Sequence, residues 1–182
     1  MECVIRTFTG REVDPLNLRQ EDINIEDIAH ALALCNRFAG HTAHPISVAQ
    51  HSVYVSRLAE EEPFQGLLHD ASEAYLGDVT KWLKRMPAMA GYREAEERAQ
   101  NTIYQAFGCS IHTHPSVENA DRIMVRYEGR LGLGPAFAIR QPGYPPLTDE
   151  EIAAIGAWGF ISWKKAEQMF LDRFQELSCN GV

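Results

Sequence analysis

The residues best suited to chemistry in this 182-residue chain are a neighbouring histidine and aspartate, His69 and Asp70. A neutral imidazole nitrogen and an anionic carboxylate oxygen side by side are good ligands for one divalent transition metal. His51 lies upstream and Asp121 downstream, each within its own expected helix. Two histidines and two aspartates are therefore available for one site. A six-coordinate cation held by these four side chains keeps positions for a water molecule and a phosphate oxygen.

The helical pattern around these residues separates polar from apolar side chains. On a helical wheel of residues 64–76, apolar side chains gather on one side, and the His-Asp pair and Glu73 gather on the other. Composition alone would explain this as a solvated polar face. Asp121 is more informative, because it falls among the apolar residues of the helix expected over 115–130. A carboxylate there is costly unless it binds a cation or a nearby arginine, and both alternatives stay open.

With this ordered set the sequence resembles the HD-domain metal-dependent phosphohydrolases, and it looks most like their compact nucleotide-cleaving branch. The features that match are a helix opening, the His-Asp pair, a glutamate, a Gly-Asp turn and a later aspartate: Gln50-His51-Ser52, His69-Asp70, Glu73, Gly77-Asp78 and Asp121. The resemblance implies four ligands for one divalent metal, which is cobalt, manganese, zinc, nickel or iron: His51, His69, Asp70 and Asp121.

The resemblance also implies two catalytic residues. Asp78 is expected to activate or position the attacking water, although an aspartate here is equally suited to cap the helix that follows. Glu73 is expected to support catalysis by orienting the site or handling a proton.

On the substrate side, the relatives place an arginine and an aromatic residue before the loop that leads to the first ligand, which here are Arg37 and Phe38. A guanidinium donates two parallel hydrogen bonds to phosphate, although a cation near a helix C-terminus is favourable by itself. Many relatives have tryptophan where this chain has Phe38 and proline where it has Thr80, so base preference stays open. Further candidate phosphate contacts are His41, His44, Lys81 and Lys84.

Enzymes that this chain resembles cleave the ester between the α-phosphorus and the sugar 5′ oxygen. Some release phosphate from deoxynucleoside monophosphates and others release triphosphate from deoxynucleoside triphosphates. The surplus of candidate cations favours the triphosphate, with 5′-deoxynucleotidase activity on monophosphates as the alternative. A second alternative is an HD-fold regulator that binds nucleotide without turnover. A cyclic-nucleotide phosphodiesterase usually needs more metal ligands than this chain offers.

Composition narrows the class of protein. With 45% apolar and 23% charged residues, the chain is expected to form one mainly α-helical HD domain over residues 1–182. The net charge of −8 disfavours a nucleic-acid polymer as partner, so the expected partner is a small nucleotide. The four cysteines are scattered, and no signal peptide or membrane span is evident, which indicates the cytoplasm of a bacterium or of a phage-infected host.

The expected elements are a short β ribbon at residues 3–8 with a turn at Gly10, followed by helices. The pattern predicts these helices over 25–38, 47–59, 63–77, 79–85, 94–107, 115–130 and 162–177. Asn24 is expected to cap the first of them, and Ser47 opens the second with the Ser-x-x-Gln spacing of a capping box. Three glycines and four prolines make residues 131–147 a loop, which could be a lid, an interface arm or a connector. As an arm it would bury Phe137, Ile139 and Tyr144 in a homo-oligomer, a dimer or hexamer.

Overall fold

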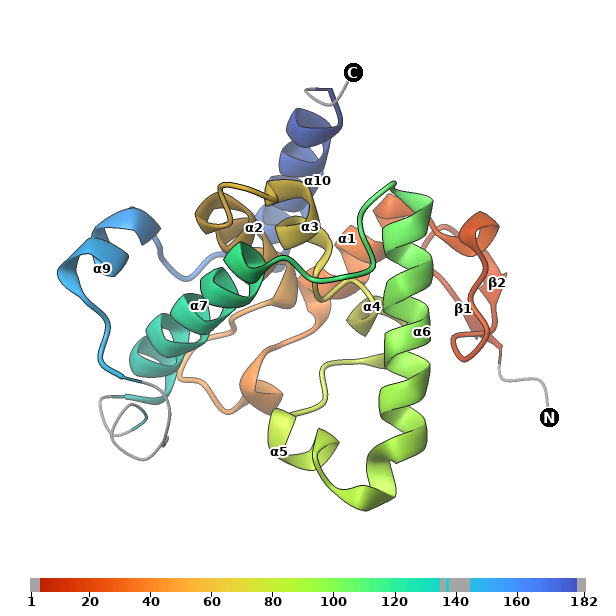
Figure 1. Cartoon of the computed structure of the whole chain (residues 1–182), viewed down its shortest axis with the longest axis horizontal. Helices are drawn as coiled ribbons and strands as arrows, with labels where there is room; N and C mark the ends of the chain where they lie inside the picture. The colour runs from red at the N-terminus through yellow and green to blue at the C-terminus, as the bar shows by residue number, and fades with distance from the viewer. Residues whose placement is uncertain (1–3, 135–136, 138–144, 180–182) are drawn as a thin grey trace.

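The computed structural model describes residues 4–134, 137 and 145–179. The chain is mainly helical, with one small antiparallel sheet beside the N-terminus, as predicted (Figure 1). Strands β1 (Ile5–Arg6) and β2 (Glu12–Val13) pair with Ile5 opposite Val13. Gly10 makes the turn between them with a φ of +87°, a conformation that glycine adopts without a Cβ clash.

The described residues form both α-helices and short 3-10 helices (η). In chain order they are η1 (Gln20–Asp22), α1 (Ile25–Leu34), η2 (Phe38–Gly40), α2 (Val48–Leu58), α3 (Pro63–Leu68), α4 (Glu73–Leu76), α5 (Lys81–Lys84), η3 (Pro87–Met89), α6 (Ala90–Ala106), α7 (Pro115–Leu133), α9 (Asp149–Ile155) and α10 (Trp163–Cys179). None of these helices combines the length and the apolar character that crossing a membrane requires.

Helix α2 is the centre of the fold. It contacts α1, α3, α7, α9 and α10, and every residue from Val48 to Ser56 is buried. Apolar side chains pack on two sides of it, one group including Ile28, Leu67 and Phe170 and the other including Val117 and Met124. Each fully buried side chain of this size contributes about 1.5–3 kcal/mol. Because α2 is enclosed in this way, a polar residue on it is held rigidly in the interior.

Two helices begin as the sequence predicts. The side chain of Asn24 accepts a hydrogen bond from the backbone of Glu26 at 2.8 Å, and Ser47 accepts one from Gln50 at 3.2 Å. The Ser47 cap is not the reciprocal box that its spacing suggests. The Gln50 side chain instead donates to the backbone oxygen of Gly159 at 2.7 Å, and thereby ties α2 to the segment before α10.

The helix expected over 63–77 is interrupted, which corrects the sequence analysis. Helix α3 ends at Leu68 and α4 begins at Glu73, so the His-Asp pair lies in the turn between them. The side chain of Gln100, on α6, donates to the Leu68 carbonyl at 2.7 Å and accepts from the Ser72 amide at 3.0 Å. These two bonds replace helical backbone bonds, and they make the turn a stable alternative to a straight helix.

Two further segments differ from expectation. The helix expected over 79–85 is the shorter α5, which starts after Thr80, so Asp78 is not its N-cap. Helix α7 continues to Leu133, and α9 was not predicted. Of the expected interface loop, residues 135–136 and 138–144, with Ile139 and Tyr144, lie outside the described residues.

Candidate metal centre

His51 is fixed deep inside the molecule by the central helix. Its side chain is fully buried, and its Nδ1 lies 3.1 Å from Oε2 of Glu128 on α7. A carboxylate only accepts hydrogen bonds, so this contact places a hydrogen on Nδ1 when the ring is neutral. The lone pair of Nε2 is then free on the opposite side of the ring, where a metal could bind.

His69 is oriented in the same manner by a different partner. Its Nδ1 lies 2.9 Å from the backbone oxygen of Gly66 in α3, an atom that can only accept. Its Nε2 therefore also presents a lone pair. Ligating histidines commonly donate their second ring nitrogen to a carbonyl or carboxylate in this way.

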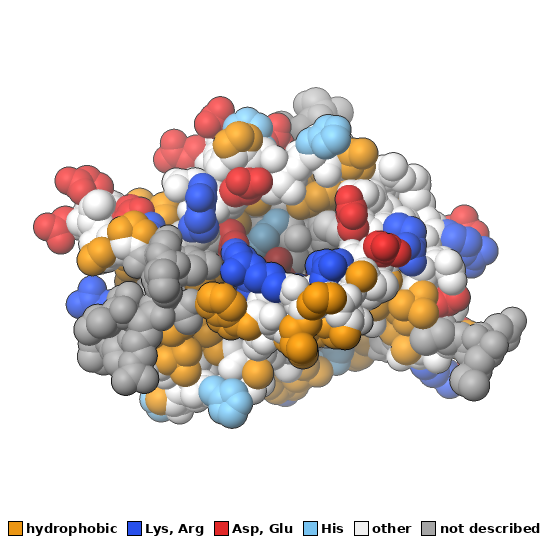
Figure 2. All heavy atoms as spheres, turned by 60° about the horizontal axis from the view of Figure 1, so that its bottom comes forward, with side chains coloured by type: hydrophobic (Ala, Val, Ile, Leu, Met, Phe, Trp, Pro, Cys, Tyr) orange, Lys and Arg blue, Asp and Glu red, His pale blue; other side chains and the backbone are white. Residues whose placement is uncertain are grey.

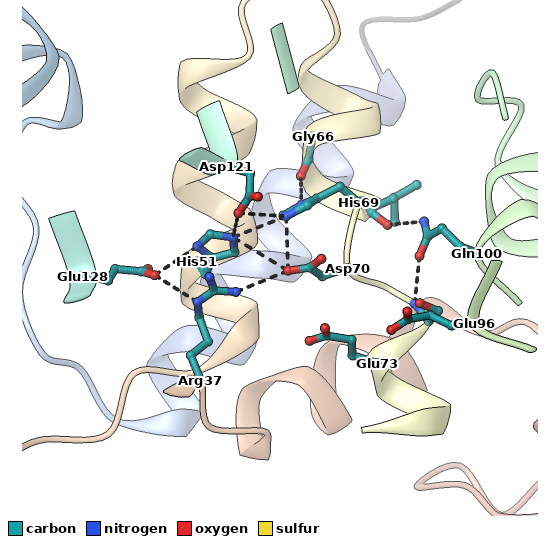
Figure 3. Close-up of polar contacts among 12 residues, drawn as sticks. Arg37, His51, Gly66, His69, Asp70, Glu73, Glu96, Gln100, Asp121 and Glu128 are labelled. Atoms are coloured by element: carbon teal, nitrogen blue, oxygen red, sulfur yellow. Dashed lines mark hydrogen bonds and ion pairs between the residues drawn. The ribbon is translucent and has the colours of Figure 1, made fainter. Parts of the chain in front are cut away.

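The free nitrogens of the two rings converge with one carboxylate (Figure 3). His51 Nε2 lies 3.3 Å from His69 Nε2, and Asp70 Oδ2 lies 3.2 Å from His69 Nε2 and 3.7 Å from His51 Nε2. Two neutral rings oriented in this way face each other with lone pairs, which repel unless a cation or proton lies between them. These three side chains form a group with the spacing of a metal site.

Asp121 adds a fourth donor from helix α7. Its Oδ1 lies 3.2 Å from His51 Nε2 and 4.0 Å from His69 Nε2. The arginine alternative does not describe this side chain, because Arg126 pairs with Glu151 and Arg122 donates to the backbone oxygen of Glu118. Around an octahedral ion with bonds of about 2.1 Å, neighbouring ligand atoms are about 3.0 Å apart and opposite ones about 4.2 Å. The five donor separations given above, which run from 3.2 to 4.0 Å, fall within this range.

Arg37 reaches the cluster from the segment after α1. Its side chain is 11% exposed; Nε donates to Glu128 Oε2 at 2.9 Å and Nη1 to Asp70 Oδ2 at 3.3 Å. Arg37 is expected at a substrate phosphate, and its guanidinium lies beside Asp70, a candidate metal ligand. Glu128 was missed, although it lies seven residues after Asp121 and therefore on the same face of the helix.

The buried charges shift the pKa of His51 and of Asp70 in this cluster. Burial and Arg37 both act to lower the pKa of His51, but Glu128 and Asp121 outweigh them and raise it to about 9. Burial acts to raise the pKa of Asp70, yet the charge and hydrogen bond of His69 lower it overall. The carboxylates around His51 thus favour a positive charge at this position, which either a proton on the ring or a bound metal ion would supply.

Glu73 and Asp78 lie beside the cluster and hold protons more tightly than ordinary acids. Burial, followed by the charges of Asp70 and Asp78, raises the pKa of Glu73 well above its usual 4.5. Its Oε2 is buried and has no hydrogen-bond partner among the described residues, while Oε1 lies 3.5 Å from Lys84 Nζ. The pKa of Asp78 is also raised by burial, against the lowering effect of Arg37.

The remaining predicted substrate residues are more dispersed. Phe38 is half-buried, its ring centre is 5.7 Å from the Arg37 guanidinium carbon, and its edge meets Phe137. Thr80 immediately precedes α5. His41, His44 and Lys81 are exposed, and the ring of His44 packs against Phe160 at 4.5 Å.

Lys84 is engaged by two acids. It forms ion pairs with Glu73 and Glu96 at 3.5 and 2.5 Å.

Figure 2 shows a hollow near the centre of the face that it presents, with a histidine visible at depth and acidic and basic side chains around the rim. The side chains of Asp121 and Asp70 are 38% and 23% exposed, so the site is open to solvent on the side where these carboxylates lie.

No protein-family model matches the chain. It is 37% identical over 178 residues to the uncharacterized protein YfdR of Escherichia coli K12, an alignment that covers 96% of this chain and 95% of YfdR. It is 35% identical over 156 residues to an uncharacterized protein of Rhodobacter capsulatus, covering 77% of this chain and 79% of that protein. Neither relative's name states an activity.

Proposed function

This chain belongs to the same family as YfdR, and we propose that it is a metal-dependent phosphohydrolase of the HD type that cleaves the 5′ phosphoester of deoxynucleotides. The observation that carries this proposal is the convergence of two histidine Nε2 atoms, each oriented through its Nδ1, with the carboxylates of Asp70 and Asp121. The same four residues are those that the HD resemblance assigns as ligands.

The donor set fits a borderline transition metal. Two imidazoles and two carboxylates suit manganese, iron, cobalt, nickel or zinc, and they would hold the ion between α2, the turn after α3 and α7. When bound, such an ion polarises a phosphoryl oxygen and lowers the pKa of a coordinated water.

Three side chains of the protein would act on the substrate directly. Arg37, with its guanidinium beside Asp70, would bind and orient the phosphate. Asp78 would position the attacking water. Glu73, whose raised pKa keeps its carboxyl protonated to higher pH, would deliver a proton to the 5′ oxygen as that oxygen leaves the phosphorus.

The ion pairs favour a substrate with one phosphate over one with three. Lys84 is paired with Glu73 and Glu96, and His44 packs on Phe160, so two of the cations expected to bind a triphosphate are engaged elsewhere. We therefore place deoxynucleoside monophosphates first. Deoxynucleoside triphosphates are the second candidate, because Lys81 and His41 are exposed and available.

Product analysis over a nucleotide panel tests this proposal. The protein is stripped of metal, reloaded with manganese or cobalt, and incubated with deoxynucleoside mono- and triphosphates, ribonucleotides and cyclic nucleotides, with Asp70→Asn as the inactive control. The proposal expects nucleoside and inorganic phosphate from the deoxymonophosphates. Release of intact triphosphate would establish the second candidate. Nucleotide binding without turnover would indicate a regulator instead.

A further inference from the structure

Glu128 is a buried carboxylate whose role is not explained by the metal ligands or by the acid-base pair. It lies in α7 with 0% exposure. One of its oxygens, Oε2, accepts from both His51 Nδ1 at 3.1 Å and Arg37 Nε at 2.9 Å, as the dashed lines of Figure 3 show. Its other oxygen, Oε1, has no hydrogen-bond partner among the described residues. A carboxylate in such surroundings is costly, because burial removes its hydration.

The first consequence of this contact concerns the histidine. Because Oε2 cannot donate, the bond requires the hydrogen of neutral His51 to lie on Nδ1. The Nε2 lone pair then faces His69 and Asp121, 3.3 and 3.2 Å away. Without Glu128, the ring could place its hydrogen on Nε2 and rotate, and both changes remove a metal ligand.

The second consequence concerns the arginine. The bond from Nε to Glu128 fixes the plane of the guanidinium and leaves Nη1 3.3 Å from Asp70. The same oxygen therefore joins a candidate metal ligand to the candidate phosphate-binding side chain. A simple structural ion pair would involve Arg37 and Glu128 alone, and it would not need to include His51.

We propose that Glu128 is the positioning residue of this site: through a single oxygen it sets the hydrogen position of His51 and the orientation of Arg37, so that metal and phosphate bind side by side. This inference rests on the proposed function for its phosphate half. Its metal half depends only on the geometry around His51.

Metal titration of the full-length protein tests the inference without measuring turnover. Glu128→Gln keeps the shape and one acceptor oxygen but loses the charge, whereas Glu128→Ala removes both bonds. Second-sphere partners of this kind change metal affinity by about 10–100-fold. We expect a loss in that range for manganese binding by calorimetry in Glu128→Ala, and a smaller loss in Glu128→Gln. The matched control is Glu118→Gln, an exposed glutamate on the same helix, which should bind as wild type does.

A spectroscopic measurement separates positioning from a merely structural role. In the metal-free protein, at a pH at which the imidazoles are neutral, nitrogen NMR should show His51 with its hydrogen on Nδ1, and this pattern should be lost in Glu128→Ala, which has no acceptor oxygen. If Glu128→Ala does not fold, Glu128→Asp, which retracts the carboxylate by one methylene, should show the intermediate loss of metal affinity.

The outcomes distinguish this inference from the proposed function. Wild-type affinity and an unchanged His51 spectrum in folded Glu128→Ala, or in Glu128→Asp if the alanine variant does not fold, would overturn the positioning role alone. A wild-type protein that binds no metal would overturn both. Weakened metal binding in a protein that hydrolyses no nucleotide would support the positioning role and refute the proposed activity.

Discussion

Gln100 holds the turn that carries His69 and Asp70, so its replacement should affect both stability and metal binding. Its amide bridges the two ends of the helix break, donating to Leu68 and accepting from Ser72. Leu68 is fully buried and Ser72 is 3% exposed, so water does not readily replace these bonds. We choose Gln100→Ala because it removes both bonds and alters no candidate ligand.

The expected magnitude follows from the two bonds. Each contributes about 1 kcal/mol net, so Gln100→Ala should lower the free energy of unfolding by about 2 kcal/mol. For a chain of this length, 1 kcal/mol corresponds to about 2–4 °C in melting temperature, which gives a decrease of about 4–8 °C. Gln100→Glu keeps the acceptor for Ser72 but sets a carboxylate oxygen against the Leu68 carbonyl. Gln100→Glu should therefore lower the free energy of unfolding by at least as much as Gln100→Ala.

Thermal and denaturant unfolding of the metal-free protein measure this effect. The matched control is Gln105→Ala on the same helix, an exposed position at which a change should stay within about 0.5 kcal/mol. Manganese titration of the same variants should show weaker binding only for the Gln100 changes, because the turn must be reordered when the metal binds. If Gln100→Ala has the same melting temperature as the Gln105→Ala control, the turn does not depend on the two bonds of Gln100, and our explanation of the broken helix is wrong.

Three further substitutions test separate parts of the site. Because burial raises the folded-state pKa of Glu73 above its usual 4.5, wild-type stability should fall as pH rises through that pKa. Metal-free Glu73→Gln should therefore gain stability relative to wild type as the pH is raised above 4.5, in melting scans at each pH, and the metal-loaded variant should show a lower kcat; a stability difference that does not change with pH would contradict the pKa shift. Asp78→Ala should lower kcat in phosphate-release assays with little effect on KM, and the opposite pattern would make it a binding residue. Ala39 has a φ of +51°, a left-handed conformation that costs a non-glycine residue about 1–2 kcal/mol, whereas glycine adds about 0.4–1 kcal/mol of freedom to the unfolded chain. Ala39→Gly should therefore raise the free energy of unfolding by about 0.5 kcal/mol in denaturant titrations, and a decrease would contradict the backbone strain.

Local signals in the sequence predicted local structure well. The caps at Asn24 and Ser47 and the turn at Gly10 each depend on residues within a few positions, and all three appear in the structure. Helix α9 was not predicted, although Thr148 and Glu151 form a complete capping box. The prolines just before it favoured the interpretation of this region as a loop.

Long-range contacts account for most of what the sequence could not predict. The break after Leu68 depends on Gln100, a residue 32 positions away. The helical pattern gives no sign of that contact, so the pair was assigned to a continuous helix. The position of Glu128 on the same helix face as Asp121 could be predicted, since the two residues are two helical turns apart. Its role beside His51 could not be predicted, because only the structure shows that contact.

Metal binding by wild-type protein and Asp70→Asn tests the central claim most directly. Metal-free protein is dialysed to equilibrium against manganese or cobalt, and bound metal per chain is determined by elemental analysis. Our account predicts a single tightly bound ion in wild type and its loss in Asp70→Asn, which must first be shown to be folded by its melting curve. Equal occupancy in the two proteins would show that His51, His69, Asp70 and Asp121 are not the metal site.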